Sequence, residues 1–475
     1  MKTIVVLSAL LVPIYMCGQT AQSLPSAPIP RASTDLFILA QAGAGSSTGM
    51  PGATQGPTTP QSPAAPQVGS GTPLSLKQAE TLAIQNNPQI SVARLNALAS
   101  QQVTREVRSN LWPTAAIDMT AVDANPGSRI TAGALNNPII YQRAAVGTTV
   151  SQLITDFGHT TNLVASANLS AKAEEQNAIA TKEQILLAVD QDFYSALQAH
   201  ALLTVAQQTV NARQTVADQI QALFNSKLKS QLDLSFANVN LAQAKLLFLD
   251  AQNNESASLA TLSMVLGYPS TRNFQLVDDT TSIAPPPGNV DDLISQAFSM
   301  RPEILSLNFE YQSAHKFQVA QRDSLLPSIR ALGAVGDTPV RNPLVSSWYG
   351  AVGLNVDIPV FNGFLYTARA REAAFREQAT QERLTDLRNR IARDVRTSWL
   401  NANTAYQRVD VTQQLLNQAN LALDLAQTRY KLGLGSIVEL SQAQLQQTQA
   451  QISGAQASYD YRLTLAVLRY ETTGI

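Results

Sequence analysis

Helical spacing of apolar residues dominates this 475-residue sequence. Two stretches, Gly158 to Phe224 and Gly363 to Tyr430, contain no proline and, after their first residue, no glycine. In the first stretch apolar residues, many of them alanine, recur every three or four positions, at Ile185, Val189, Ala196, Ala199, Leu203, Ala206, Val210, Ala217 and Ile220. Such a seam is typical of coiled coils. Each stretch therefore predicts one helix of about 100 Å, at ~1.5 Å per residue.

The apolar pattern changes to a period of two in four other segments. In the last of them Trp348, Val352 and Leu354 alternate with Tyr349 and other polar or small residues. One apolar face and one polar or small face are typical of a β-strand between two different environments. We therefore predict two β-hairpins, at residues 114–154 and 328–358.

These patterns occur twice in the same order, so the chain is predicted to be a duplicated unit. Each copy has two short helices separated by a proline, then a hairpin, a long helix, a tight turn and a second long helix. In each turn a serine precedes an acid by three residues, as expected for a new helix N-cap. The predicted parts are a first repeat at 73–268 with its turn at 225–232, a linker at 269–289, and a second repeat at 290–475 with its turn at 431–437.

The N-terminal segment predicts export. Lys2 precedes an apolar run from Ile4 to Leu11, which is typical of a signal peptide, here residues 1–17. Cys17 is the single cysteine, which excludes an internal disulfide. It is either a lipid anchor or lies just before a later cleavage site. Residues 18–72, rich in Pro, Gly and Ser, predict a disordered tether.

Composition and motifs exclude several classes of function. The chain has 33 Lys+Arg against 34 Asp+Glu, so no general affinity for nucleic acid follows. His159, His200 and His315 are scattered without the spacing of metal ligands, and no cofactor is implied. Gly433-x-Gly435 follows a helix and lacks the third glycine and the lysine of phosphate-binding loops. With no catalytic motif, we do not expect an enzyme.

Several of these segments together resemble the TolC-type outer membrane efflux protein family. They are Leu74-Ser75-Leu76 with Asn86-Asn87-Pro88, Ile358-Pro359-Val360-Phe361-Asn362-Gly363, and Tyr430-Lys431-Leu432-Gly433-Leu434-Gly435-Ser436. The resemblance implies a mainly α fold with transmembrane β: a homotrimer with a shared 12-stranded barrel in the outer membrane and an α-helical tunnel in the periplasm. Two hairpins cannot span a membrane as an open sheet, because backbone in lipid must be paired and membrane barrels need at least ~8 strands, so the chain must associate with copies of itself.

The resemblance also implies that the two turns form the periplasmic tip, at Lys227, Gly433, Gly435 and Ser436. Asp233 and Tyr430 match an inter-chain gate contact, and Glu439 matches a carboxylate of the constriction. Gly435 stands where some members carry a gate arginine, and Gln442 where a second acid occurs. Because Lys227 replaces the glycine expected from Gly433, we expect the two turns to differ in backbone. Alternatively, Asp233 and Glu439 only favour the positive ends of the following helices.

Trp348 and Tyr349 either belong to an aromatic girdle at the membrane interface or merely begin a strand. The function that we predict is a passive outer-membrane exit duct of a tripartite efflux pump or type I secretion system. A periplasmic adaptor would gate it and link it to an inner-membrane pump. One alternative is that the chain is itself such an adaptor, which the alternating hairpins disfavour. A soluble helical enzyme is the other, and the missing site disfavours it.

Overall fold

A computed structural model describes residues 72–125, 142–278, 284–340 and 346–474. The predicted signal peptide, Cys17 and almost all of the predicted tether lie outside these ranges. The helices are α1 (Leu76–Asn86), α2 (Pro88–Ser109), α3 (His159–Asn225), α4 (Gln231–Val265), α5 (Val290–Met300), α6 (Pro302–Asp323), α7 (Leu365–Lys431) and α8 (Ile437–Thr473). The strands are β1 (Thr72–Leu74), β2 (Thr114–Val122), β3 (Arg143–Thr155), β4 (Phe274–Leu276), β5 (Ser328–Val340) and β6 (Trp348–Asp357).

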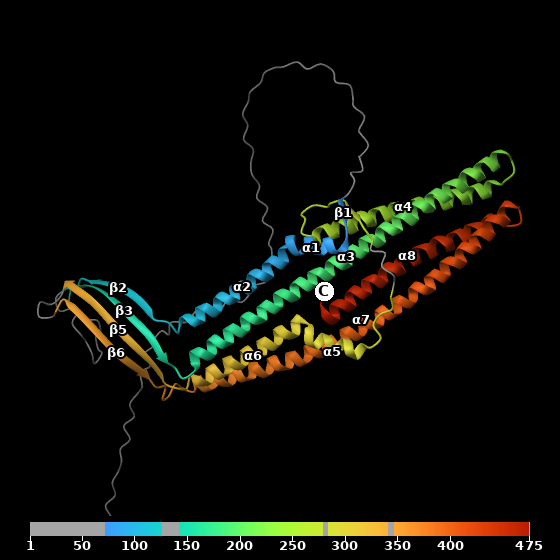
Figure 1. The fold of residues 1–475 in the computed structure, drawn as a ribbon. Helices are drawn as coiled ribbons and strands as arrows, with labels where there is room; N and C mark the ends of the chain where they lie inside the picture. Colours follow the sequence, from blue (N-terminus) through green and yellow to red (C-terminus); the bar gives the residue numbers. More distant parts are fainter. Residues whose placement is uncertain (1–71, 126–141, 279–283, 341–345, 475) are drawn as a thin grey trace, which may run out of the picture. The chain divides into compact units, whose positions relative to one another are not determined.

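The order α1-α2-β2-β3-α3-α4 is repeated as α5-α6-β5-β6-α7-α8. Proline begins the second helix of each copy, where its missing N–H costs nothing. Asn87 caps α2 by accepting a hydrogen bond from the backbone N–H of Gln89, at 2.9 Å. Within the described unit the four-stranded sheet lies at one end of the long helices and both turns lie at the other (Figure 1).

Helices α3 and α7 each have 67 residues, which corresponds to about 100 Å. Much of the predicted alanine seam of α3 is buried, including Val189, Ala196, Ala206 and Ala217. Small side chains at these positions let the neighbouring helices approach closely, and α3 packs along α2, α4, α6 and α8. None of the described helices combines the length and apolar character needed to cross a membrane.

The segment predicted as a linker, residues 269–289, also contains a strand. Its residues Phe274–Leu276 form β4, which pairs in parallel with β1. The reason is local packing: Leu74 is buried in the apolar core between α1, α3 and α4, and Phe274 packs against the same core. The segment predicted as a linker therefore contains one short strand, which the sequence did not predict.

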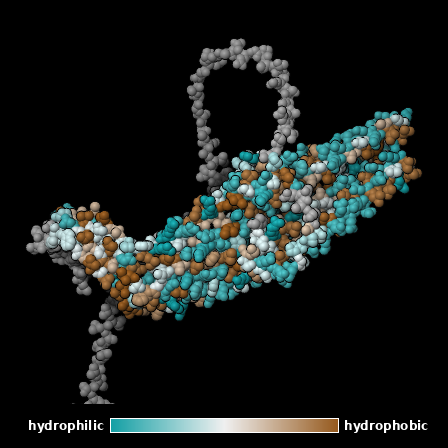
Figure 2. Space-filling model, in the orientation of Figure 1, coloured by the Kyte–Doolittle hydropathy of each residue, from teal (hydrophilic) through white to brown (hydrophobic). Residues whose placement is uncertain are grey.

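The four-stranded sheet has the order β2-β3-β5-β6, and all its pairs are antiparallel. The β3–β5 pair joins the two copies of the repeat. Cross-strand register places most of the exposed apolar side chains on one face, namely Ile117, Met119, Val146, Val150, Val335, Val352 and Leu354. Hydrophobic surface gathers over the sheet and where it meets the helices (Figure 2). The other face carries mostly small and polar residues.

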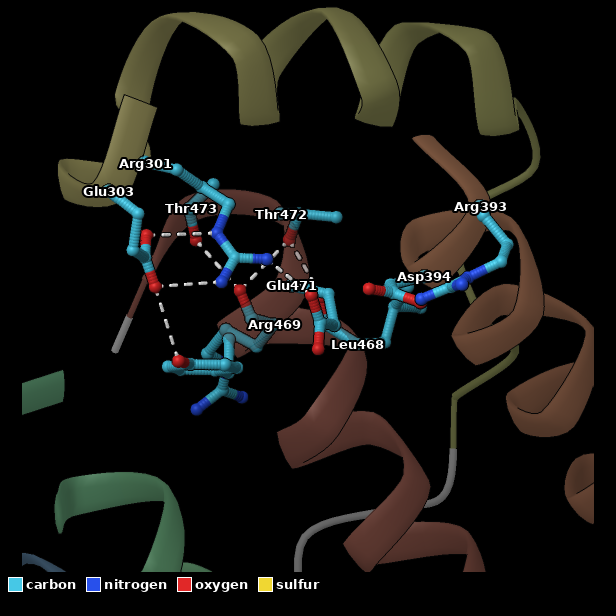
Figure 3. A network of polar contacts seen from close by, with 10 residues as sticks. Arg301, Glu303, Arg393, Asp394, Leu468, Arg469, Glu471, Thr472 and Thr473 are labelled. Carbon is cyan, nitrogen blue, oxygen red and sulfur yellow. Dashed lines mark hydrogen bonds and ion pairs between the residues drawn. The ribbon is translucent and has the colours of Figure 1, made fainter. Parts of the chain in front are cut away.

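A buried ionic network ties the end of α8 to the junction of α5 and α6 (Figure 3). Arg301, only 7% exposed, donates hydrogen bonds to Glu303 at 2.9 and 3.2 Å and forms an ion pair with Glu471. The hydroxyl of Tyr470 donates to Glu303 at 3.3 Å. Burial alone would raise the pKa of Glu303, but Arg301 holds it below its ordinary value. The buried guanidinium of Arg301 is thus paired with two carboxylates.

Candidate functional site: the helix tips and the four-stranded sheet

The turn between α3 and α4 closes in a Schellman motif. The N–H of Leu228 donates to the carbonyl of Leu223, and the N–H of Lys227 donates to that of Phe224, both at 2.9 Å. This pair of hydrogen bonds satisfies the last carbonyls of α3. It also requires a left-handed residue, and Lys227 has φ of 57°.

The turn between α7 and α8 has the same geometry. The N–H of Leu434 donates to Arg429 at 2.8 Å, and that of Gly433 to Tyr430 at 3.2 Å. Gly433 has φ of 74°, close to the value at Lys227. The prediction that the two turns differ in backbone is therefore wrong. Because the hydrogen bonds of the motif and the serine cap that follows determine the turn, lysine is held in a conformation that glycine adopts more readily.

The serine caps are equivalent, but the acids that follow them have different partners. Ser230 and Ser436 accept hydrogen bonds from the backbone N–H of Asp233 and Glu439, at 3.2 and 3.1 Å. The Asp233 carboxylate also accepts two hydrogen bonds from Ser230, one from its backbone N–H at 3.1 Å and one from its hydroxyl at 2.7 Å. Burial by itself raises the pKa of Asp233, but these hydrogen bonds and the charge of Lys229 bring it below its ordinary value.

Glu439 forms an ion pair with Arg429, with Nε and Oε1 3.0 Å apart. Arg429 also donates from Nη2 to the carbonyl of Leu434, at 3.3 Å. A Cβ on Gly435 would lie only 3.2 Å from Arg429 Cβ and from Glu439 Oε2, so this pair uses the space beside the glycine. Sequence reasoning missed Arg429; its place in the last turn of α7, close to a predicted acid of α8, was the available signal.

Tyr430 is buried in the core that joins the two helix pairs, against residues such as Ile220 and Leu440. The ammonium of Lys229 lies 3.9 Å from the centre of its ring. Burial raises the pKa of Tyr430, and the charge of Asp233 raises it further. The gate contact between Asp233 and Tyr430 was predicted between chains and stays a prediction; within the described ranges the Tyr430 hydroxyl forms no hydrogen bond.

A groove of about 720 Å³ with a mixed polar and apolar lining runs between the two helix pairs beside the turns. The apolar part of its lining includes Ile220, Leu223, Leu228 and Leu440. Four leucines of the turns are also exposed to solvent: Leu228, Leu232, Leu432 and Leu434. The tips therefore present hydrophobic surface where a soluble helical hairpin would be expected to present polar residues.

In the sheet, Trp348 and Tyr349 lie on opposite faces, because side chains alternate along a strand. Trp348 shares the apolar face with Val352, and its ring lies beside Gly350. Tyr349 lies on the other face, where a Cβ on Gly336 would overlap its hydroxyl. The two residues cannot belong to one girdle, and we keep that proposal for Trp348 alone.

Each histidine has a polar partner. The Nδ1 atom of His159 lies 2.8 Å from the carbonyl of Ala320. His200 contacts Glu255 at 2.6 Å, and His315 contacts Glu377 at 2.8 Å. In the part of the chain that the structure describes, no group of three or more His, Cys, Asp or Glu could hold a metal ion.

Comparison with protein-family models matches residues 81–268 and 293–470 to the outer membrane efflux protein family. The chain is 20% identical to the outer membrane protein TolC of Salmonella enteritidis over 414 residues, which is 83% of this chain and 82% of TolC. Among solved structures, CusC superimposes with a TM-score of 0.74 at 18% identity, covering 84% of this chain and 92% of CusC. The Campylobacter jejuni CmeC outer membrane channel gives 0.72 at 16% identity, over 84% and 85% of the two chains. The chain therefore belongs to the outer membrane efflux protein family, and the prediction of an efflux channel in the outer membrane is confirmed.

Proposed function

We propose that three copies of this chain form one passive exit duct, in which the sheets close a 12-stranded barrel and the helices line a periplasmic tunnel. A periplasmic adaptor contacts the helix tips and connects the duct to an inner-membrane pump, which supplies the work. The chain itself catalyses no reaction. The family match gives no support to the alternative that this chain is the adaptor.

The observation that carries this proposal is a sheet with one apolar face and two free edges. Val352, on the apolar face, is 92% exposed in the single chain. Strands β2 and β6 lie at the two edges, and among the described strands neither has a partner on its outer side. Lipid offers no hydrogen bonds to such edges, and four strands are too few for a membrane barrel. Pairing of β6 with β2 of the next copy satisfies both requirements.

Helices α4 and α7 support the same assembly. Within the chain the two helix pairs meet mainly through α3 and α8. This leaves apolar side chains of the other two helices exposed: Val239, Leu246 and Leu249 on α4, and Val411, Leu415, Leu421 and Leu425 on α7. A neighbouring copy that packs α7 against α4 would bury both sets. The proposed trimer thus uses the same contact at all three interfaces.

Disulfide cross-linking of the sheet edges tests the barrel. One cysteine replaces Ala116 on β2, and a second replaces Ala351, Gly353 or Asn355 on β6 in three separate variants. Within one chain the two edges are three strand spacings apart, about 14 Å, which is too far for a disulfide. Oxidation of outer-membrane fractions is therefore expected to give covalent dimers and trimers with at least one variant.

The matched control pairs cysteine at Ala116 with cysteine at Val352, which lies on the opposite face. Variants that carry only one of the two added cysteines show any cross-linking through the native Cys17. The proposal also predicts trimers that resist mild detergent and dissociate on heating. Protein that stays monomeric in the membrane, without cross-links in any of the three variants, would contradict the shared barrel.

A further inference from the structure

Arg213 is a buried arginine of α3, and it lies between the two helix pairs. It is 9% exposed. Its Nη2 atom donates one hydrogen bond, to the hydroxyl of Thr448 on α8, at 3.2 Å. That hydroxyl in turn donates to the backbone carbonyl of Gln444, at 3.1 Å. A guanidinium has five N–H donors, so most of its capacity is not used by this contact.

The charge of Arg213 has no counter-charge among the described residues. Desolvation lowers its pKa to about 10, and no carboxylate contributes to that shift. The group therefore remains protonated at neutral pH. Arg301, which is buried to a similar degree, has Glu303 and Glu471 as partners. Burying a charge is costly unless it is paired, so an unpaired guanidinium at this depth calls for an anion.

A pocket of about 200 Å³ adjoins the guanidinium. Its lining is mainly neutral and polar, and it includes Gln208 of α3, Gln427 of α7, and Gln444 and Gln451 of α8. Gln444 is only 3% exposed, and it lines the pocket together with Arg213. The pocket thus combines one fixed positive charge, a lining of glutamine amides and enough space for a small ligand with water.

We propose that this pocket binds one small monovalent inorganic anion, held by the Arg213 guanidinium and the Gln444 amide. One fixed positive charge balances one negative charge, whereas a divalent anion would leave excess charge buried. Because α3, α7 and α8 all line the site, a bound anion stabilises the contact between the helix pairs. The site lies about 18 Å before the end of α3, at ~1.5 Å per residue, close to the proposed tip.

Thermal unfolding of the purified full-length protein tests the site. Chloride replaces gluconate stepwise at constant ionic strength, for wild type, Arg213→Gln and Gln444→Met. Arg408→Gln, a change at an exposed arginine of α7, is the control. A ligand that binds only the folded state raises Tm in a saturable way. We expect this rise in wild type and Arg408→Gln, its loss in Arg213→Gln, and a weaker rise in Gln444→Met.

Equal Tm values in chloride and gluconate for wild type, or an undiminished rise in Arg213→Gln, would overturn the proposal. If Arg213→Gln does not fold, wild-type crystals grown in bromide decide the question. An anomalous peak within hydrogen-bonding distance of Arg213 supports the anion site. A map without such a peak, or with a carboxylate of a neighbouring copy in the pocket, overturns it.

Discussion

Asp190 of α3 is a buried carboxyl group beside an apolar core. It is 1% exposed, next to the buried residues Val189 and Phe193, and its Oδ1 atom has no hydrogen-bond partner in the described ranges. Burial raises its pKa to about 7, the charge of Glu80 adds to the shift, and Arg469 opposes it. Asp190 is therefore neutral in mild acid and becomes a buried anion above neutrality.

This shift predicts a pH dependence of stability. The folded-state pKa lies above the unfolded value of 3.8, so between these values the folded chain holds a proton that the unfolded chain has lost. Stability is expected to fall as pH rises through this window, by at most about 1.4 kcal/mol per pH unit from this group. In Asp190→Asn that part of the loss is expected to disappear. Tm measured between about pH 4 and about pH 8 tests the sign.

Asp250→Asn, a change at an exposed acid of α4, is the control for this experiment. It should keep the wild-type pH profile. If Asp190→Asn also keeps that profile, Asp190 does not ionise in the range expected.

Lys227 stores strain in the first turn. Its left-handed backbone costs an L-residue about 1 kcal/mol, whereas glycine adopts it without a clash. Lys227→Gly is therefore expected to raise stability, by up to about 1 kcal/mol, and to raise the Tm of the protein. The equivalent Gly433→Ala, at φ of 74°, should lower stability by a similar amount. If Lys227→Gly and Gly433→Ala both raise stability, or both lower it, the backbones of the two turns are not equivalent in solution.

At the scale of the elements, the sheet places two kinds of residue on its two faces. Val352 belongs to the apolar face, and Ala351 lies on the polar one. On a lipid-facing position near the middle of a membrane, arginine costs about 2–4 kcal/mol. Val352→Arg is therefore expected to lower the temperature at which the trimer dissociates in detergent extracts. Ala351→Arg, the neighbouring control, should have a much smaller effect.

If both variants lower the dissociation temperature equally, the face of Val352 is not the one that contacts lipid. The same alternation explains why Trp348 and Tyr349 separate. Adjacent residues of one strand point to opposite faces of the sheet, so Trp348 and Tyr349 cannot both lie in one girdle.

For the whole molecule, the tips decide what passes if the proposed tunnel closes there. Asp233 is held by its capping serine, and Glu439 is neutralised by Arg429. If these carboxylates line the constriction, Asp233→Ala is expected to reduce the cation selectivity of trimers in planar bilayers. Arg429→Gln should increase it, because it frees the charge of Glu439. The exposed ion pair itself adds at most about 1 kcal/mol to stability.

Glu439→Ala is expected to act like Asp233→Ala in reversal-potential measurements. Glu255→Ala, far from the turns on α4, is the control. Unchanged selectivity in both tip variants would remove the two acids from the constriction and leave them as helix-capping residues.

Local patterns in the sequence determined the elements and their order. Proline at Pro88 and Pro302 ends one helix and begins the next, because it lacks an N–H and restricts the preceding residue. The absence of proline and glycine in α3 and α7 leaves nothing to interrupt two helices of 67 residues. Ser230 and Ser436 mark the starts of α4 and α8, since their hydroxyls cap the first turns. These are interactions among near neighbours in the chain.

Contacts between distant segments were decided only by the tertiary structure. The pairing of β4 with β1, the unpaired charge of Arg213 and the buried carboxyl of Asp190 each depend on residues far away in the sequence. Lysine at 227 was expected to change its turn, but the hydrogen bonds around it impose the same backbone as at Gly433. Periodicity in the sequence identifies which residues share a face, whereas burial, charge pairing and strain depend on what the folded chain brings against that face.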